Sequence, residues 1–257
     1  MAETRQPARS APPGVAGDGL RAFGSAADLE LDFARTDRSA LVTALLARCA
    51  VPCDADHWWT QTVGARTAAL LRVLEASDGA PALALSSRCG ACGAAFEFGL
   101  PLAALAAAEA AAPPSLCVTL PGRPPLSLRR PTGDDLRGWR AAGWTSRQDA
   151  VRAMLGALWI AGPLPGPEDE PALAAALGAL DPLVAFAVDC QCPGCGAAQA
   201  VSIDLEGIAL SRLAARQDAL LLDVHRLASS YGWTEAEVLA VPAARRRRYL
   251  ALIEADA

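Results

Sequence analysis

The clearest alternation of apolar and polar positions lies in the last third of the chain. From Leu210 to Tyr231, apolar residues recur at spacings of three and four, interrupted only by Gln217. Arginines and other polar residues occupy the opposite face. The segment therefore predicts one long amphipathic helix packed against an apolar surface, ending at Gly232.

Weaker helical periodicity and capping signals recur along the rest of the chain. Thr132 and Ser146 are each followed by acidic residues and have the form of helix N-caps. Thr234 and Glu237 form a capping box. Beyond the long helix, we expect helices over residues 38–50, 63–76, 147–158, 171–180, 235–241 and 243–254.

Short apolar stretches bounded by turn residues predict strands. Residues 115–120 and 126–129 are expected to form a hairpin across a proline-rich turn. Residues 81–85 and 183–187 have matching patterns, and each leads into a cysteine motif that a second short strand follows. The chain therefore contains a repeated unit of strand, turn and strand.

The repeated turn is a Cys-x-x-Cys-Gly knuckle. Residues 89–95 read Cys-Gly-Ala-Cys-Gly-Ala-Ala, and residues 192–198 read Cys-Pro-Gly-Cys-Gly-Ala-Ala. Two facing knuckles supply four thiolates to one tetrahedral ion, and a glycine after each pair allows the positive φ of a tight turn. We predict one structural Zn²⁺ per chain, held by Cys89, Cys92, Cys192 and Cys195.

Other interpretations of the cysteines remain open. A redox Cys-x-x-Cys and knuckles that bind no metal are the two alternatives to zinc, although a thioredoxin-type motif begins a helix rather than joining two strands. Cys190 could replace a knuckle ligand, but the repeat aligns it with Ser87. Cys49, Cys53 and Cys117 lie among apolar residues and are expected to be buried.

These elements predict an α+β fold with a split zinc-ribbon-like β unit, a helical insert and a C-terminal helical region. The insert separates the two halves of the metal site. The expected segments are a disordered leader (1–20), an N-terminal helical segment (21–80), the first knuckle and a β-hairpin (81–130), the insert (131–182), the second knuckle (183–205) and the C-terminal helices (206–257).

Composition narrows the functional classes. The chain has 257 residues, a net charge of −5 and no lysine, which excludes a Walker A loop and a lysine Schiff base. Its apolar fraction of 53% comes with no uninterrupted run long enough to span a membrane, and the N-terminus lacks secretory-signal character, so we expect a cytoplasmic protein.

His57 is expected in a loop anchored by two tryptophans, and His225 as a packing or capping residue. An enzyme is the weakest hypothesis.

The one basic run is Arg245, Arg246, Arg247 and Arg248. Arginines on a helix can contact phosphates, so a zinc-ribbon nucleic-acid-binding or regulatory module is the alternative function. However, residues 206–257 contain equal numbers of basic and acidic residues. An exposed helix that pairs with acidic groups is the better interpretation, and nucleic acid is not the expected partner.

Residues 222–250 resemble the ending of tailed-phage baseplate proteins and baseplate hub assembly chaperones. The shared features are a helix, Tyr231-Gly-Trp233, a capped acidic turn, a short helix and an Arg-rich helix ending in Tyr-Leu. The Cys-Pro-x-Cys-Gly knuckle before the long helix is similar to the same family. So are Gly64-Ala-Arg-Thr-Ala-Ala-Leu-Leu and Leu128-Arg-Arg-Pro-Thr-Gly-Asp-Asp-Leu.

This resemblance implies a noncatalytic component or assembly chaperone of a phage-like contractile tail baseplate. Its expected partners are baseplate or hub proteins, and the chain would then be cytoplasmic or part of a phage-like particle. Aromatic and arginine side chains dominate protein interfaces. The residues expected to contact a partner are Tyr231, Trp233, Tyr249, Arg245, Arg246, Arg247 and Arg248.

Overall fold

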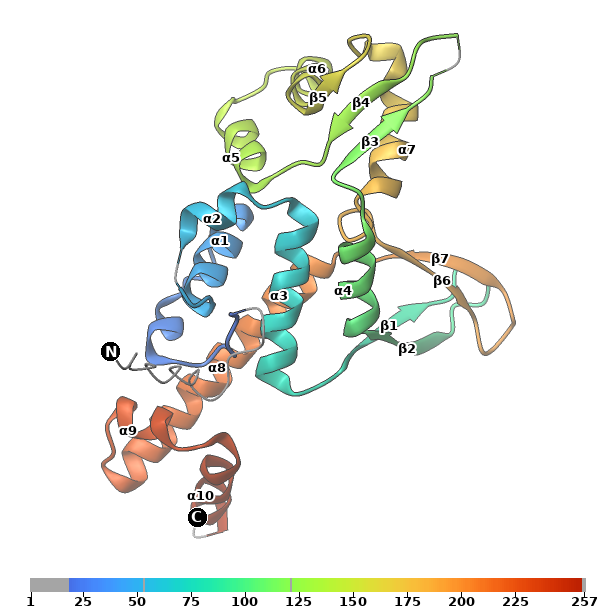
Figure 1. Cartoon of the computed structure of the whole chain (residues 1–257). Coiled ribbons are helices and arrows are strands. Elements are labelled where there is room, and N and C mark those ends of the chain that lie inside the picture. The colour runs from blue at the N-terminus through green and yellow to red at the C-terminus, as the bar shows by residue number, and fades with distance from the viewer. Residues whose placement is uncertain (1–18, 53, 121, 256–257) are drawn as a thin grey trace, which may run out of the picture.

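Three helices form the centre of the molecule: α1 (Arg38–Cys49), α3 (Val63–Asp78) and α8 (Leu205–Tyr231) (Figure 1). The computed structural model describes residues 19–52, 54–120 and 122–255. The largest hydrophobic core lies where these helices meet. Each helix contributes a leucine with no exposed surface, namely Leu45, Leu70 and Leu213.

The ends of these helices follow from the local sequence. The side chain of Thr62 accepts a hydrogen bond from the amide of Ala65 and caps α3, which ends at Gly79 in the left-handed region. Helix α8 ends at Gly232, as predicted, but begins five residues before Leu210. The earlier start is explained by Asp204, whose carboxylate accepts the Gly207 amide at 2.9 Å.

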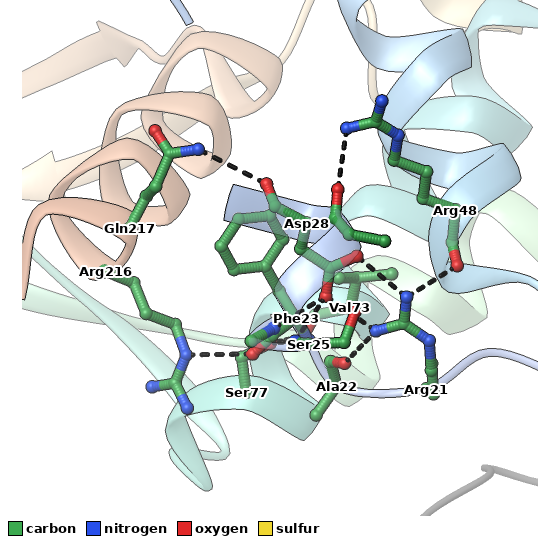
Figure 2. Close-up of polar contacts among 12 residues, drawn as sticks. Arg21, Ala22, Phe23, Ser25, Asp28, Arg48, Val73, Ser77, Arg216 and Gln217 are labelled. Atoms are coloured by element: carbon green, nitrogen blue, oxygen red, sulfur yellow. Dashed lines mark hydrogen bonds and ion pairs between the residues drawn. The ribbon is translucent and has the colours of Figure 1, made fainter. Parts of the chain in front are cut away.

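A short N-terminal segment is organised around the side chain of Asp28. This residue lies in the 3₁₀ helix η1 (Ala26–Glu30), and its side chain is completely buried. Arg21 donates two hydrogen bonds of 2.7 Å to the Asp28 carboxylate, and the amides of Gly24 and Ser25 donate two more at 2.8 Å (Figure 2). A buried charge needs such complete pairing to be tolerated.

Gln217, the break in the apolar face of α8, joins that helix to the same segment. Its amide nitrogen lies 3.2, 3.0 and 2.9 Å from the carbonyl oxygens of Asp28, Leu29 and Leu31. The side chain is buried, so an apolar residue there would remove the side-chain donor to the Leu29 and Leu31 carbonyls, whereas the Asp28 carbonyl would keep the Leu31 amide at 3.1 Å. The polar interruption therefore fixes the register of α8 on the core.

The predicted leader ends earlier than the sequence suggested. Gly19 and Leu20 belong to the folded structure: the Gly19 carbonyl accepts the Val51 amide at 2.8 Å, and Leu20 forms a bridge with Ala50. Leu20 is only 3% exposed and contributes to the main core. The rest of the predicted leader lies outside the described residues.

The two knuckle motifs lie on two antiparallel hairpins, placed side by side in Figure 1. The first consists of β1 (Ala82–Arg88) and β2 (Ala95–Pro101), and the second of β6 (Ala187–Gln191) and β7 (Ala198–Ser202). Three of the four predicted strands are confirmed, but β6 begins only at Ala187, because residues 182–185 still form the turn that leaves α7. Each hairpin is its own two-stranded sheet, so the strands do not join into one continuous ribbon.

The β2 strand continues into a helix that the sequence analysis did not assign, α4 (Leu102–Ala111). Leu102 and Leu105 of this helix are buried in the main core. Its sequence is almost entirely apolar, so it has no polar face to reveal a period. Alanine's high intrinsic helix propensity was the available signal.

The predicted insert (131–182) shares a small core with the hairpin of residues 115–129, which the predicted segments had placed with the first knuckle (81–130). Strands β3 (Ser115–Val118), β4 (Leu126–Arg129) and β5 (Trp159–Ala161) form a sheet in that order. The helices of the insert are α5 (Gly133–Ala141), α6 (Arg147–Leu158) and α7 (Glu170–Leu180), with the 3₁₀ turn η2 (Pro167–Asp169) before α7. Strand β5 was not predicted. Leu128, Leu158 and Leu173 are buried between the sheet and these helices.

A buried ion cluster joins the insert to the central helices. Arg130 donates to Glu109 of α4 at 2.6 Å and to Asp181, just after α7, at 2.7 Å. The cluster packs directly on Gly64 of α3, where a Cβ atom would clash with Arg130 Nη2. Gly64 therefore has a packing role at the N-terminus of α3, whose helix dipole favours the two nearby carboxylates.

The segment containing His57 differs from its prediction. Residues 55–60 form the short helix α2 (Ala55–Thr60) rather than a loop, capped by Asp54. Only one of its two tryptophans is buried in the core, Trp58. The ring of Trp59 instead has the guanidinium groups of Arg66 and Arg137 over it, 5.1 and 4.7 Å from its centre.

The C-terminal helices form a separate cluster at the end of α8. Helix α9 (Glu235–Ala240) begins with the predicted Thr234 capping box, and α10 (Ala243–Ala255) follows it. Leu227, Val238 and Leu250 form the small core between the three helices. In Figure 1 this cluster projects away from the two hairpins.

The described elements confirm an α+β fold built of helices and small antiparallel sheets. Within the described ranges, no helix combines the length and apolar character needed to cross a membrane.

Candidate metal centre

Both knuckles have the same local backbone geometry. The Cys89 amide donates to the Ala94 carbonyl at 2.9 Å, and the Gly93 amide donates to the Cys89 carbonyl at 2.9 Å. The second knuckle repeats both bonds, from Cys192 to Ala197 and from Gly196 to Cys192. Gly93 and Gly196 have φ values of 75° and 73°, as the repeat predicted. Each motif joins two strands and does not begin a helix.

The two turns bring four cysteine sulfurs together. Cys89 Sγ lies 3.7 Å from Cys195 Sγ, and Cys92 Sγ lies 3.7 Å from Cys192 Sγ. All four sulfurs lie within 4.8 Å of one another. Four sulfurs placed 2.3 Å from one ion at tetrahedral angles would be about 3.8 Å apart. The group therefore has the size that a tetrahedral metal site requires.

The four thiols differ in exposure and in pKa. Cys89 and Cys192 are buried, whereas Cys92 and Cys195 are exposed. The amides of Cys92 and Ala91 point at the Cys89 sulfur and lower the pKa of Cys89 to about 6. The Ala197 amide favours the Cys195 thiolate, but the three neighbouring thiols outweigh it and raise the pKa of Cys195 to about 12. Four thiolates at these distances need a cation to offset their repulsion.

The other cysteines that the structure describes take no part in this group. Cys190 is half-buried and packs beside Cys89 and Cys192, but it is not one of the four clustered ligands. Cys49 is buried as expected, and burial raises the pKa of its thiol to about 12. Cys117 is exposed, which contradicts its prediction. Cys53 lies outside the described residues.

Two side chains around the sulfurs were missed by the sequence analysis. Phe96 is 7% exposed and packs against Cys89 and Cys192. Gln199 contacts the opposite knuckle: its Oε1 accepts the Gly90 amide at 2.9 Å, and its Nε2 donates to the Arg88 carbonyl at 3.2 Å. Phe96 and Gln199 occupy equivalent positions of the repeat, one apolar and one polar. This difference between two otherwise matching motifs could have identified both residues from the sequence.

The aromatic residues predicted to contact a partner do lie together. The Tyr231 and Trp233 rings stack with centres 5.0 Å apart, and Tyr249 meets both rings at steeper angles. Tyr231 is 41% exposed, whereas Trp233 and Tyr249 are half-buried against the small C-terminal core. The trio forms one surface at the junction of α8, α9 and α10.

The four consecutive arginines do not share one role. Arg245, Arg247 and Arg248 are exposed, and none of them forms an ion pair with a residue that the structure describes. Arg246 is only 7% exposed and donates to the Val241 carbonyl at 3.1 Å. Arg246 is therefore not part of the exposed basic surface that the sequence predicted, because its position on α10 turns it toward the end of α9.

The two histidines lie apart from the sulfur group. His57 is exposed on α2, where its ring meets Trp58 edge-on with centres 5.1 Å apart. His225 is exposed on α8, so its expected packing role is not supported. Neither belongs to the clustered metal-ligating residues.

The comparisons add no relative. Searches against protein-family models, curated proteins and solved structures gave no significant match to this chain.

Proposed function

We propose that the protein is a noncatalytic component or assembly chaperone of a phage-like contractile tail baseplate, stabilised by one structural zinc ion. The observation that carries the zinc part is the 3.7 Å spacing between sulfurs of opposite knuckles. The baseplate part rests on the resemblance of residues 222–250. The zinc would be held in a zinc-ribbon-like arrangement of the two hairpins.

The ligand set favours a structural role for the metal. Four cysteines complete the tetrahedral coordination of zinc and leave no position for water or a substrate. Thiolates also favour zinc over magnesium or calcium, which prefer oxygen ligands. When bound, the ion would supply charge compensation and cross-linking rather than Lewis-acid chemistry. It would connect two residues 100 positions apart, Cys92 and Cys192.

The metal site would help to orient α8. Only two residues separate β7 from the start of this helix, and Arg212 of α8 donates to the Ala84 carbonyl of β1 at 2.6 Å. Strand β7 thus leads into α8, and β1 contacts its first half. A metal ion that joins the two hairpins would therefore fix both strands and, with them, the first half of α8. At the other end of α8, Tyr231 meets Trp233 and Tyr249, and α10 carries the three exposed arginines.

We assign partner binding to that distal surface. Tyr231 offers an exposed ring supported by two others, and Arg245, Arg247 and Arg248 are free to pair with acidic groups of another protein. We expect Tyr231→Ala combined with Arg248→Glu to abolish co-purification. Trp144→Ala combined with Arg152→Glu, on the exposed surface of the insert, is the matched control.

The biological experiment uses the gene cluster that contains this chain. Tagged full-length protein is expected to co-purify with tail or baseplate proteins of that cluster, and deletion of its gene should yield incomplete tails in electron micrographs. Intact tails after deletion, together with no baseplate protein in the purified sample, would contradict the proposal.

Nucleic-acid binding is the second candidate and makes a different prediction. The three exposed arginines could contact phosphates, and such binding would weaken steeply with salt. Because Arg246 is buried, only three of the four consecutive arginines can contact a phosphate. A salt-dependent gel shift, lost in Arg248→Glu but kept in Tyr231→Ala, would favour this function over the baseplate role.

A further inference from the structure

Gln199 connects the two knuckles through its side-chain amide. It lies on β7, directly after the second knuckle, and reaches the backbone on both sides of Cys89. Its Oε1 accepts the Gly90 amide at 2.9 Å, while its Nε2 donates to the Arg88 carbonyl at 3.2 Å. One side chain thus satisfies a donor and an acceptor that flank a metal-ligating sulfur.

The hairpins have few other means of alignment. They belong to separate sheets, so no backbone ladder connects them. Among the residues that the structure describes, the two Gln199 bonds and the contacts between sulfurs are the hydrogen bonds that join the hairpins. Gln199 therefore supplies the direct polar link between the two halves of the sulfur group.

The equivalent position in the first hairpin has a different role. There Phe96 faces the sulfurs and excludes water from Cys89 and Cys192. A phenyl ring can cover the site, but it cannot pair with backbone amides and carbonyls. The repeat therefore places one apolar cover and one polar link at symmetric positions around the metal site.

We infer that Gln199 is a positioning residue for the metal centre, which raises its affinity by aligning Cys89 with the ligands of the second knuckle. This inference rests on the proposed zinc site. Holding ligands in place before the ion binds lowers the entropy lost on binding. Residues that orient metal ligands from outside the coordination sphere typically change affinity by about 10- to 100-fold.

The test compares two glutamines of the same hairpin in the full-length protein. Gln199→Leu removes both hydrogen bonds and keeps a side chain of similar size. Gln191→Leu is the matched control, because Gln191 is exposed and its side chain makes no hydrogen bond with a described residue. Competition with a chromophoric chelator measures the zinc dissociation constant of each variant.

We expect Gln199→Leu to raise the dissociation constant about tenfold or more, and Gln191→Leu to leave it within about twofold. The cobalt-substituted variant should keep the charge-transfer absorption of four thiolates, because no ligand is lost. Equal zinc affinity in both variants would overturn the inference.

Amide hydrogen exchange of the zinc-bound protein provides an independent readout. In Gln199→Leu, the Gly90 amide should exchange faster while the Cys89 and Gly93 amides remain protected by their own bonds within the turn. Loss of protection at all three amides would indicate general unfolding of the knuckle and contradict a positioning role. If the wild type binds no zinc, the proposed function fails, whereas the Gly90 result still tests the Gln199 contact.

Discussion

The two knuckle hairpins have the same turn but differ in how they are anchored. Strands β1 and β2 contribute the buried side chains Leu83, Phe96 and Leu100. In β6 and β7, by contrast, no residue is buried, and only partly buried side chains contact the main core. The first hairpin is part of the core, and the second lies on its surface.

The second hairpin is held mainly at its two ends. At one end, Cys192 and Cys195 approach the first knuckle, and Gln199 contacts its backbone. At the other end, the Ile203 amide donates to the Phe186 carbonyl at 2.9 Å, and Asp204 caps α8. The difference shows that a duplicated motif need not duplicate its stabilising interactions. We expect the second hairpin to depend on the metal and the first to depend on apolar burial.

Metal removal should give the largest difference between the hairpins. Because zinc contributes about 10 kcal/mol or more in small zinc domains, its loss should release the element with little apolar burial. Chelation is therefore expected to abolish hydrogen-exchange protection in β6–β7 while β1–β2 keeps most of its protection. Equal loss in both hairpins would show that they unfold as one unit and would contradict the expected difference in anchoring.

Truncating one apolar side chain in each hairpin should give the next largest difference. Leu83→Ala empties a completely buried position and should lower the free energy of unfolding by about 2–5 kcal/mol. Val188→Ala, at a half-buried position in β6, should lower it by about 1 kcal/mol. Urea unfolding of the zinc-bound protein measures both values. A larger loss for Val188→Ala would show that the second hairpin depends more on apolar burial than the first.

Substitution of Asp204, at the base of the second hairpin, should have the smallest effect on the free energy of unfolding. Asp204→Ala removes the cap of α8 and the ion pair with Arg38, so we expect a loss of about 1 kcal/mol. Asp204→Asn keeps a side-chain acceptor for the Gly207 amide and should lose only part of this stability. Thermal unfolding of the two variants beside the wild type measures the difference. Equal losses would assign the effect to the ion pair rather than to the cap.

The charge of Asp204 also predicts the direction of its pH dependence. Burial raises the pKa of Asp204, but hydrogen bonds from Arg38 and the Gly207 amide outweigh it and hold the pKa below the usual 3.8. Its stabilising contribution is therefore present above pH 3.8 and is lost as the pH falls through the lowered pKa. The Gly207 amide resonance, followed by NMR during acidification, reports this titration.

The sequence predicted the elements whose signals are local. The apolar period of α8 and the knuckle glycines depend on neighbouring residues, so their signals lie within short segments. The equal spacing of the two motifs also indicated which four cysteines would meet. Helix α4 was missed because its residues are almost all apolar and no face stands out.

Other features depend on contacts between distant segments. Gln217 looked like a flaw in the apolar face of α8, but it serves carbonyls of the N-terminal segment. Arg246 looked like part of a basic surface, yet the position of α9 decides that it is buried. In both cases the residue type was visible in the sequence, whereas its partner was set by the tertiary fold.

We propose that four cysteines of two distant knuckles hold one structural zinc ion. Native mass spectrometry of the full chain tests it most directly, with Cys92→Ser as the ligand variant and Cys117→Ser as the control for an exposed cysteine outside the group. We predict one zinc per chain in the wild type and in Cys117→Ser, and no stable zinc in Cys92→Ser. A folded wild type without zinc, or equal zinc retention in both variants, would contradict the account.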